Sequence, residues 1–153
     1  MVPNAKQGLL IARTLKISFI VSGLLFLYIV FKTPRTATAP PQSAIEIIIS
    51  AIALTNVALG FILPGFIARS ALRRQTSMLP STTPIQSWIS GYVLSLTFFE
   101  SCMLFGVVLH FIGSRLFVVE CLFAAGLLAI VFWGPGSPPI ERGETTTKVF
   151  PGA

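Results

Sequence analysis

The sequence has 153 residues, of which 54% are hydrophobic and only 10% are charged. Soluble domains carry about 25% charged residues, so this composition argues against an ordinary water-soluble domain and favours lipid as the main solvent. The net charge of +6 does not indicate nucleic-acid binding, because the basic residues lie in short segments between apolar runs. We therefore predict an all-α integral membrane protein that binds no nucleic acid.

Four apolar runs predict four membrane-spanning helices, since one span needs about 20 apolar residues. The predicted spans cover residues 9–31, 44–68, 84–112 and 115–133, and together they form a four-helix transmembrane bundle over residues 1–133. The first run follows basic residues, as a signal peptide does. Pro40 directly after the small residues Ala37-Thr38-Ala39 disfavours cleavage there, so we expect this helix to be retained.

Proline and glycine residues punctuate these runs. Pro64 and Gly65 predict a kink near the far end of the second helix. Gly113 and Ser114 predict a left-handed helix stop, which would make the last two helices a tight antiparallel hairpin. The tail, residues 134–153, is rich in Pro and Gly, a composition that does not favour folding on its own. We expect it to lie against a partner.

The distribution of basic residues predicts the orientation. With four spans, both termini and the middle loop share one side. Eight Lys or Arg residues fall on that side, namely Lys6, Arg13, Lys16, Arg69, Arg73, Arg74, Arg142 and Lys148, and three on the other, namely Lys32, Arg35 and Arg115. The positive-inside rule then places both termini in the cytoplasm. We expect an integral protein of the bacterial inner (cytoplasmic) membrane.

Glu100 lies near the middle of the third predicted span. A carboxyl group at membrane depth must be neutral, paired or exposed to water. Counted from the inner helix ends, Glu100 lies about 24 Å and Asn56 about 18 Å along their helices, about one turn apart. Glu100, Asn56 and the adjacent Thr55 therefore form a candidate ion-binding site. In the alternative interpretation, Glu100 is a protonated acid that joins two helices, worth about 1 kcal/mol.

The segment ESCMLFGVV, from Glu100 to Val108, resembles the ion-carrying helix of the rotary ATPase c subunit, the proteolipid. That family has a mid-membrane acid and, in its Glu-bearing members, a glycine six residues on, as Gly106 is here. The preceding Ala68-Arg69 and Arg73-Arg74-Gln75 are similar to its short basic loop. The resemblance implies that Glu100 carries an ion and that Asn56 is its polar neighbour. Unlike the family, this chain has its acid on the third helix, so we expect no ring assembly.

His110, Arg115 and Glu120 lie near the predicted turn between the last two helices. One interpretation is an interfacial polar cluster in which Arg115 or His110 offsets the charge of Glu120. In the other, His110 is a neutral imidazole in an apolar wall and ligates the metal of a haem or chlorophyll. The chain has one His, which excludes a bis-His haem, and its 13 Phe residues are candidate neighbours of a carotenoid or other pigment.

No nucleophile–base pair, phosphate-binding loop or metal-ligand cluster appears in the sequence, so we predict that the protein is not an enzyme. The predicted function is a non-catalytic accessory or structural subunit of a larger membrane complex, of an energy-transducing kind. The alternatives are ion translocation through Glu100 and the holding of a pigment or haem through His110. The expected partners are membrane lipids and other integral membrane subunits.

Overall fold

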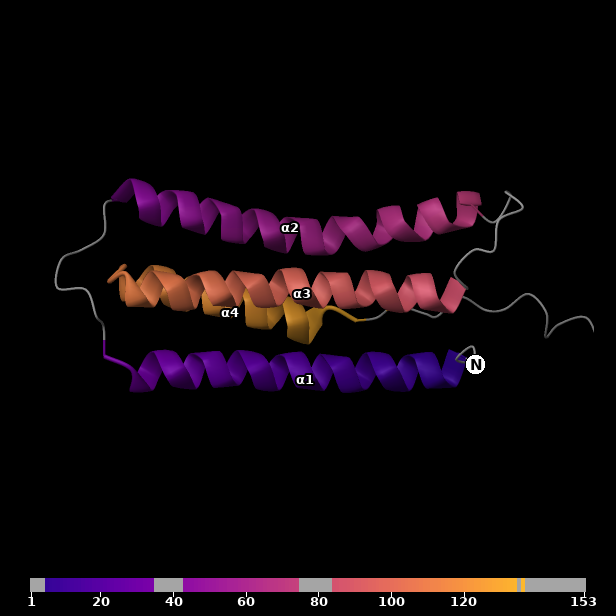
Figure 1. Cartoon of the computed structure of the whole chain (residues 1–153), viewed down its shortest axis with the longest axis horizontal. Coiled ribbons are helices and arrows are strands. Elements are labelled where there is room, and N and C mark those ends of the chain that lie inside the picture. The colour runs from indigo at the N-terminus through magenta and orange to yellow at the C-terminus, as the bar shows by residue number, and fades with distance from the viewer. Residues whose placement is uncertain (1–4, 35–42, 75–83, 135, 137–153) are drawn as a thin grey trace, which may run out of the picture.

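A computed structural model describes residues 5–34, 43–74, 84–134 and 136 of the chain. They form four helices, α1 (Ala5–Lys32), α2 (Ser43–Arg74), α3 (Pro84–Phe111) and α4 (Leu116–Phe132). The all-α class with four helices is thus confirmed. Each helix runs antiparallel to the one before it (Figure 1). We call the end of the bundle with Gly113 and Ser114 the turn end, and the opposite end, where α1 begins, the amino-terminal end. The linker around Pro40, the loop 75–83 and the tail 137–153 lie outside the described residues.

Three helices of the described part are long and apolar enough to cross a membrane, over Lys6–Lys32, Ala44–Ile67 and Ile85–Phe111. The fourth, α4, has 17 residues and is about 25 Å long, a little less than the roughly 30 Å of a hydrocarbon core. Its predicted crossing therefore stays a prediction. α2 continues past the predicted end at residue 68, through Pro64, as far as Arg74.

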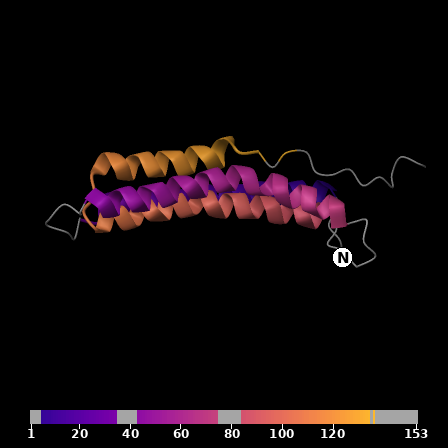
Figure 2. The ribbon, with the colours of Figure 1, turned by 90° about the horizontal axis from the view of Figure 1, so that it is seen from above.

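α3 is the central helix of the bundle. In the most apolar 18-residue stretch of each long helix, 44% of the residues of α3 are buried, against 11% in α1 and in α2. α1 and α2 flank α3 on opposite sides (Figure 1), and within the described ranges these two helices do not contact each other. α4 packs along a third side of α3. It is shorter than the other three helices and ends before they do, as Figure 2 shows. The fourth side of α3 is left open.

Most of the buried core residues belong to α3 and α4. Its fully buried side chains include Leu96, Phe99, Met103 and Leu109 of α3 and Val119 and Ile130 of α4. Gly126 lets the two helices approach closely, because a Cβ there would lie 2.6 Å from Met103 Cγ and 2.8 Å from the carbonyl oxygen of Phe99. No real Cβ contact is that short, so this position of α4 requires glycine.

The turn between α3 and α4 is a Schellman motif, as the Gly113-Ser114 pair predicts. Gly113 has a φ of 83°, in the left-handed region that glycine adopts without a Cβ clash. Its amide donates to the carbonyl of His110, and the amide of Ser114 donates to that of Leu109. This pair of bonds satisfies the last carbonyls of α3 and reverses the chain directly into α4.

The other end of α4 lies inside the length of the bundle, beside the middle of α3 (Figure 1). Lys16 of α1 donates from Nζ to the carbonyl of Val131 at 2.7 Å and to that of Trp133 at 3.2 Å. The ring of Trp133 packs against Phe61 and Phe99, with centroids 5.0 and 6.2 Å away. An ammonium group at a helix C-terminus satisfies free carbonyls and opposes the negative end of the helix dipole. Lys16 therefore acts as the cap of α4.

Candidate functional site

Glu100 is half-buried on the side of α3 that faces α1. Its Oε1 accepts a hydrogen bond from the hydroxyl of Ser22. Ser22 lies ten residues before the end of α1 and Glu100 eleven before the end of α3, so both are about 15 Å from the turn end. The carboxyl group thus has a polar partner at its own depth in the bundle.

The other two residues of the predicted ion site bond elsewhere. Asn56 donates from Nδ2 to the hydroxyl oxygen of Ser101 at 2.9 Å, and Ser101 in turn donates to the carbonyl of Phe98. The hydroxyl of Thr55 donates to the carbonyl of Ala51, within its own helix. Asn56 of α2 therefore bonds to the residue that follows Glu100 on α3, and Asn56 and Glu100 belong to two separate hydrogen-bonded pairs. The structure brings Ser22 to Glu100 where the sequence pointed to Asn56 or Thr55.

Glu100 also borders the open side of α3. The exposed residues of this helix include Ser90, Thr97, Leu104 and Val108. Their spacings of seven, seven and four residues place them on one stripe, between the sides that face α1 and α2. Glu100 follows Thr97 by three residues and precedes Leu104 by four, so it lies next to the stripe. A helix that packed here would lie beside the carboxyl group.

His110 is 4% exposed and lies at the turn end. Its Nε2 is 3.1 Å from the carbonyl oxygen of Thr33, which can only accept, so Nε2 carries the proton. In the neutral ring Nδ1 is then an acceptor, and it is buried without a hydrogen-bond partner in the described structure. Leaving a buried polar atom unpaired costs about 1–3 kcal/mol. A donor from a ligand would recover this cost.

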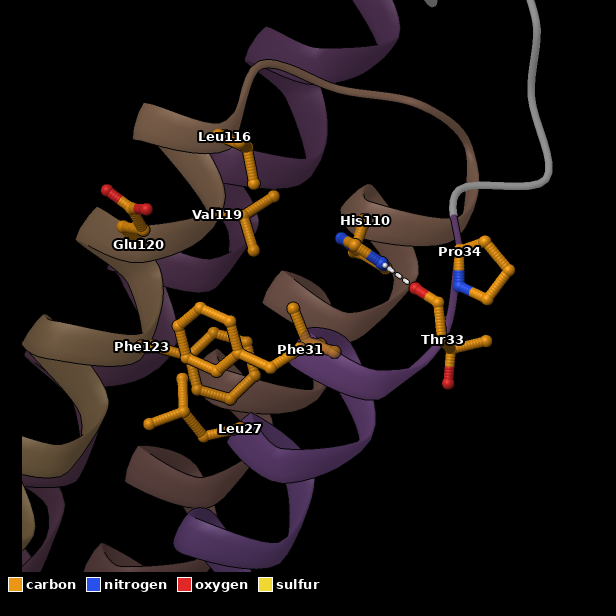
Figure 3. A pocket seen from close by; sticks show the side chains of 10 residues that line it. Leu27, Phe31, Thr33, Pro34, His110, Leu116, Val119, Glu120 and Phe123 are labelled. Carbon is orange, nitrogen blue, oxygen red and sulfur yellow. Dashed lines mark hydrogen bonds between the residues drawn. The ribbon is translucent and has the colours of Figure 1, made fainter.

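A cavity of about 310 Å³ adjoins His110, between the ends of α1, α3 and α4. Its polar side chains are Thr33, His110 and Glu120, and the rest of the wall is apolar (Figure 3). Figure 3 shows Nδ1 of His110 turned towards the side that Leu116 and Val119 form, with Glu120 at the outer edge. The volume is at the lower limit for small-molecule pockets.

The predicted polar cluster is only partly assembled. His110 and Glu120 line one cavity, but His110 bonds to Thr33, and Glu120 is exposed on α4. Arg115 is exposed at the start of α4 and is not among the residues that line the cavity. Within the described ranges, no group of three or more His, Cys, Asp or Glu residues could hold a metal ion.

The residues at this cavity do not fit a haem or chlorophyll on His110. The outer ring nitrogen, Nε2, is held by the carbonyl of Thr33. The remaining nitrogen, Nδ1, is buried and is bonded to Cγ, on the backbone side of the ring, so a flat macrocycle centred on it would be crowded by α3. A small hydrogen-bond donor meets neither obstacle. The arrangement suits a hydrogen-bonded ligand better than a metal-bound one.

Two participants were absent from the sequence-based sites. The depth count that selected Asn56 would have added Ser22 as a further candidate, had it been applied to the first helix as well. Thr33 contributes a backbone carbonyl, which any residue type would supply, so no sequence signal marks it. Comparison with protein-family models, with curated proteins and with solved structures gave no match to this chain.

Proposed function

We propose that the protein is a non-catalytic integral membrane subunit of a larger membrane complex. The observation that carries this proposal is the exposed apolar surface of the flanking helices. α1 exposes large side chains such as Ile17, Leu24 and Phe31, and α2 exposes others such as Ile47 and Phe66. Soluble monomers rarely expose contiguous apolar patches above a few hundred Å². Such a surface suits contact with lipid and with other membrane helices.

The open stripe of α3 supports a partner subunit in particular. Lipid contact needs no periodic pattern, whereas a packed helix meets a stripe of residues seven and four apart, as Ser90, Thr97, Leu104 and Val108 are. α1 and α2 stand on either side of this stripe without touching each other. One further helix would therefore fill the space and cover Leu104, which is 44% exposed. An energy-transducing complex is the class we propose, on the sequence resemblance around Glu100.

The test is site-specific photocrosslinking in native membranes. A photoreactive residue at Thr97 or Leu104 should crosslink to one defined membrane protein, which also co-purifies in mild detergent. Leu128 is the matched control, because it is similarly exposed but lies on α4, away from the stripe. A chain that purifies alone, with equal and lipid-only crosslinking from all three positions, would contradict a subunit role.

Ion translocation through Glu100 is the second candidate, and its half-buried place beside the open stripe supports it. A carrier must exchange between a sheltered state and an open one, and Glu100 has Ser22 on one side and the stripe on the other. Carbodiimide should then label Glu100, and raised pH or the carried ion should suppress the labelling. A Glu100→Gln variant with full transport activity would rule out this role.

A further inference from the structure

The space beside His110 continues along the bundle as a groove between α1 and α4. A second cavity of about 260 Å³ shares Leu27, Phe31, Glu120 and Phe123 with the first. It extends the space to Gly23 of α1, ten residues before Thr33 and hence about 15 Å along the helix. The two cavities thus form one groove that runs from the turn end towards the middle of the bundle.

Two helix faces form the walls of this groove. On α4, Glu120, Phe123 and Leu127 follow one another at spacings of three and four residues, and so do Gly23, Leu27 and Val30 on α1. Side chains of α3 lie between the two walls. Apart from its end near His110, Thr33 and Glu120, the lining is apolar. A groove of this shape suits a single hydrocarbon chain whose polar head lies at the turn end.

The free polar atoms that His110 and Glu120 offer to the groove are hydrogen-bond acceptors. The N–H of His110 is already used by the carbonyl of Thr33, which leaves the buried, unpaired Nδ1 as an acceptor. Glu120 offers carboxyl oxygens, and no ion pair joins it to another described residue. Within a membrane, an ionised carboxyl group near a helix end is stabilised by a cation. A head group with N–H donors and a positive charge meets both requirements, whereas an anionic head group meets neither.

We propose that the α1–α4 groove binds a membrane lipid with a primary ammonium head group, whose ammonium is held at Glu120 and His110 and whose chain lies along Leu27 and Phe123. The proposal rests on the membrane setting proposed above but not on a partner subunit. It assigns the groove to lipid and the open stripe of α3, on the other side of the bundle, to protein.

The test compares two lipids that differ only in their donors. Phosphatidylethanolamine carries three N–H groups, and phosphatidylcholine has the same charges and no N–H. The purified full-length chain is exchanged into mixed micelles of either lipid, or of anionic phosphatidylglycerol, and bound lipid is counted by native mass spectrometry. We expect about fivefold preferential retention of phosphatidylethanolamine.

Three variants localise the effect. Glu120→Gln should reduce the preference to about twofold or less, while Glu46→Gln, the same change at the same end of the bundle but on α2, should leave it intact. Ala124→Phe fills the groove from an exposed position of α4 and should lower retention of all three lipids. Circular dichroism checks that each variant is helical.

Equal retention of the three lipids by the unaltered chain would overturn the proposal, and so would full retention by Ala124→Phe. If a partner helix occupies the groove instead, Ala124→Phe would release the crosslinked partner protein while the isolated chain shows no preference among head groups. If no partner protein crosslinks to the stripe of α3 but phosphatidylethanolamine is still retained preferentially, the subunit role fails and the lipid site stands, so the two failures are distinguishable.

Discussion

The bond between Ser22 and Glu100 joins the first helix to the third at a partly buried point of the bundle. We predict that Ser22→Ala lowers the free energy of unfolding by about 1 kcal/mol, because the half-buried carboxyl group loses its donor. Glu100→Gln should cost less than about half as much, since the amide oxygen still accepts from Ser22. Thermal unfolding in a mild detergent, followed by circular dichroism, measures both changes.

Ser18→Ala is the control for this pair. Ser18 lies one turn before Ser22 on the same helix, is exposed, and donates to the carbonyl of Thr14 in its own helix. Its loss should leave the melting temperature nearly unchanged. If Ser22→Ala were as silent as Ser18→Ala while Glu100→Gln destabilised the protein, the carboxyl group would have a partner other than Ser22.

Polar pairs of this kind are the part of the site that the sequence could not predict. A single acid in an apolar helix shows that a partner exists, and a count of depth limits the partner to a few positions on each neighbouring helix. It does not show which helix faces the acid. The depth count favoured Asn56, but the rotation of α3 turns Ser101 towards Asn56 and Glu100 towards α1.

At the scale of the helices, Lys16 determines where α4 can end. We predict that Lys16→Met exposes the carbonyls of Val131 and Trp133 and loosens the last turn of α4. Hydrogen exchange should become at least about tenfold faster at the amide of Trp133, which donates to Ala129, while amides near Leu122 stay protected.

Lys16→Arg should restore most of the protection, because a guanidinium group also donates to carbonyls. Lys6→Met, which removes a charge from an exposed position of the same helix, should not alter exchange in α4. Equal effects of Lys6→Met and Lys16→Met would mean that the charge of α1, rather than the cap, protects α4.

Close packing of α3 and α4 gives a second prediction for the helices. Gly126→Ala should destabilise the bundle by about 1–3 kcal/mol, because the new methyl group would overlap Met103 and the backbone oxygen of Phe99. Gly65→Ala is the matched change, since a Cβ there would have no neighbour within 4 Å, and it should be neutral or slightly stabilising. Thermal unfolding compares the two. A neutral Gly126→Ala would show that α4 shifts away from α3 at little cost.

The helices themselves were accessible from the sequence, because hydrophobic runs and glycine or proline punctuation are local signals. Gly113 marks the end of α3 for that reason. The position of the end of α4 in the bundle could not be predicted in the same way. The apolar run predicts only that a helix stops near Trp133, whereas its place beside the middle of α3 depends on the Lys16 contact from a helix more than 100 residues earlier.

At the scale of the whole molecule, the antiparallel order puts Lys6 and Arg115 at opposite ends of the bundle. We predict that, in a Cys121→Ala background, Lys6→Cys is protected from a membrane-impermeant maleimide in intact cells and Arg115→Cys is labelled. The remaining native thiol, Cys102, is fully buried and should not react. The reverse pattern would invert the predicted orientation, and labelling of both from outside would contradict a crossing bundle.

Because α1 and α2 do not touch, all helix contacts of α1 in the described structure are with α3 and α4. The packing of α1 on the bundle therefore uses no contact with α2 in the described structure. We predict that residues 1–38 and residues 39–153, expressed together as two separate chains, associate in the membrane. A tag on the larger piece should then recover the smaller one. Ser22→Ala in the smaller piece should reduce its recovery, and failure of the unaltered pieces to associate would show that α1 stays in place only while it is covalently joined to α2.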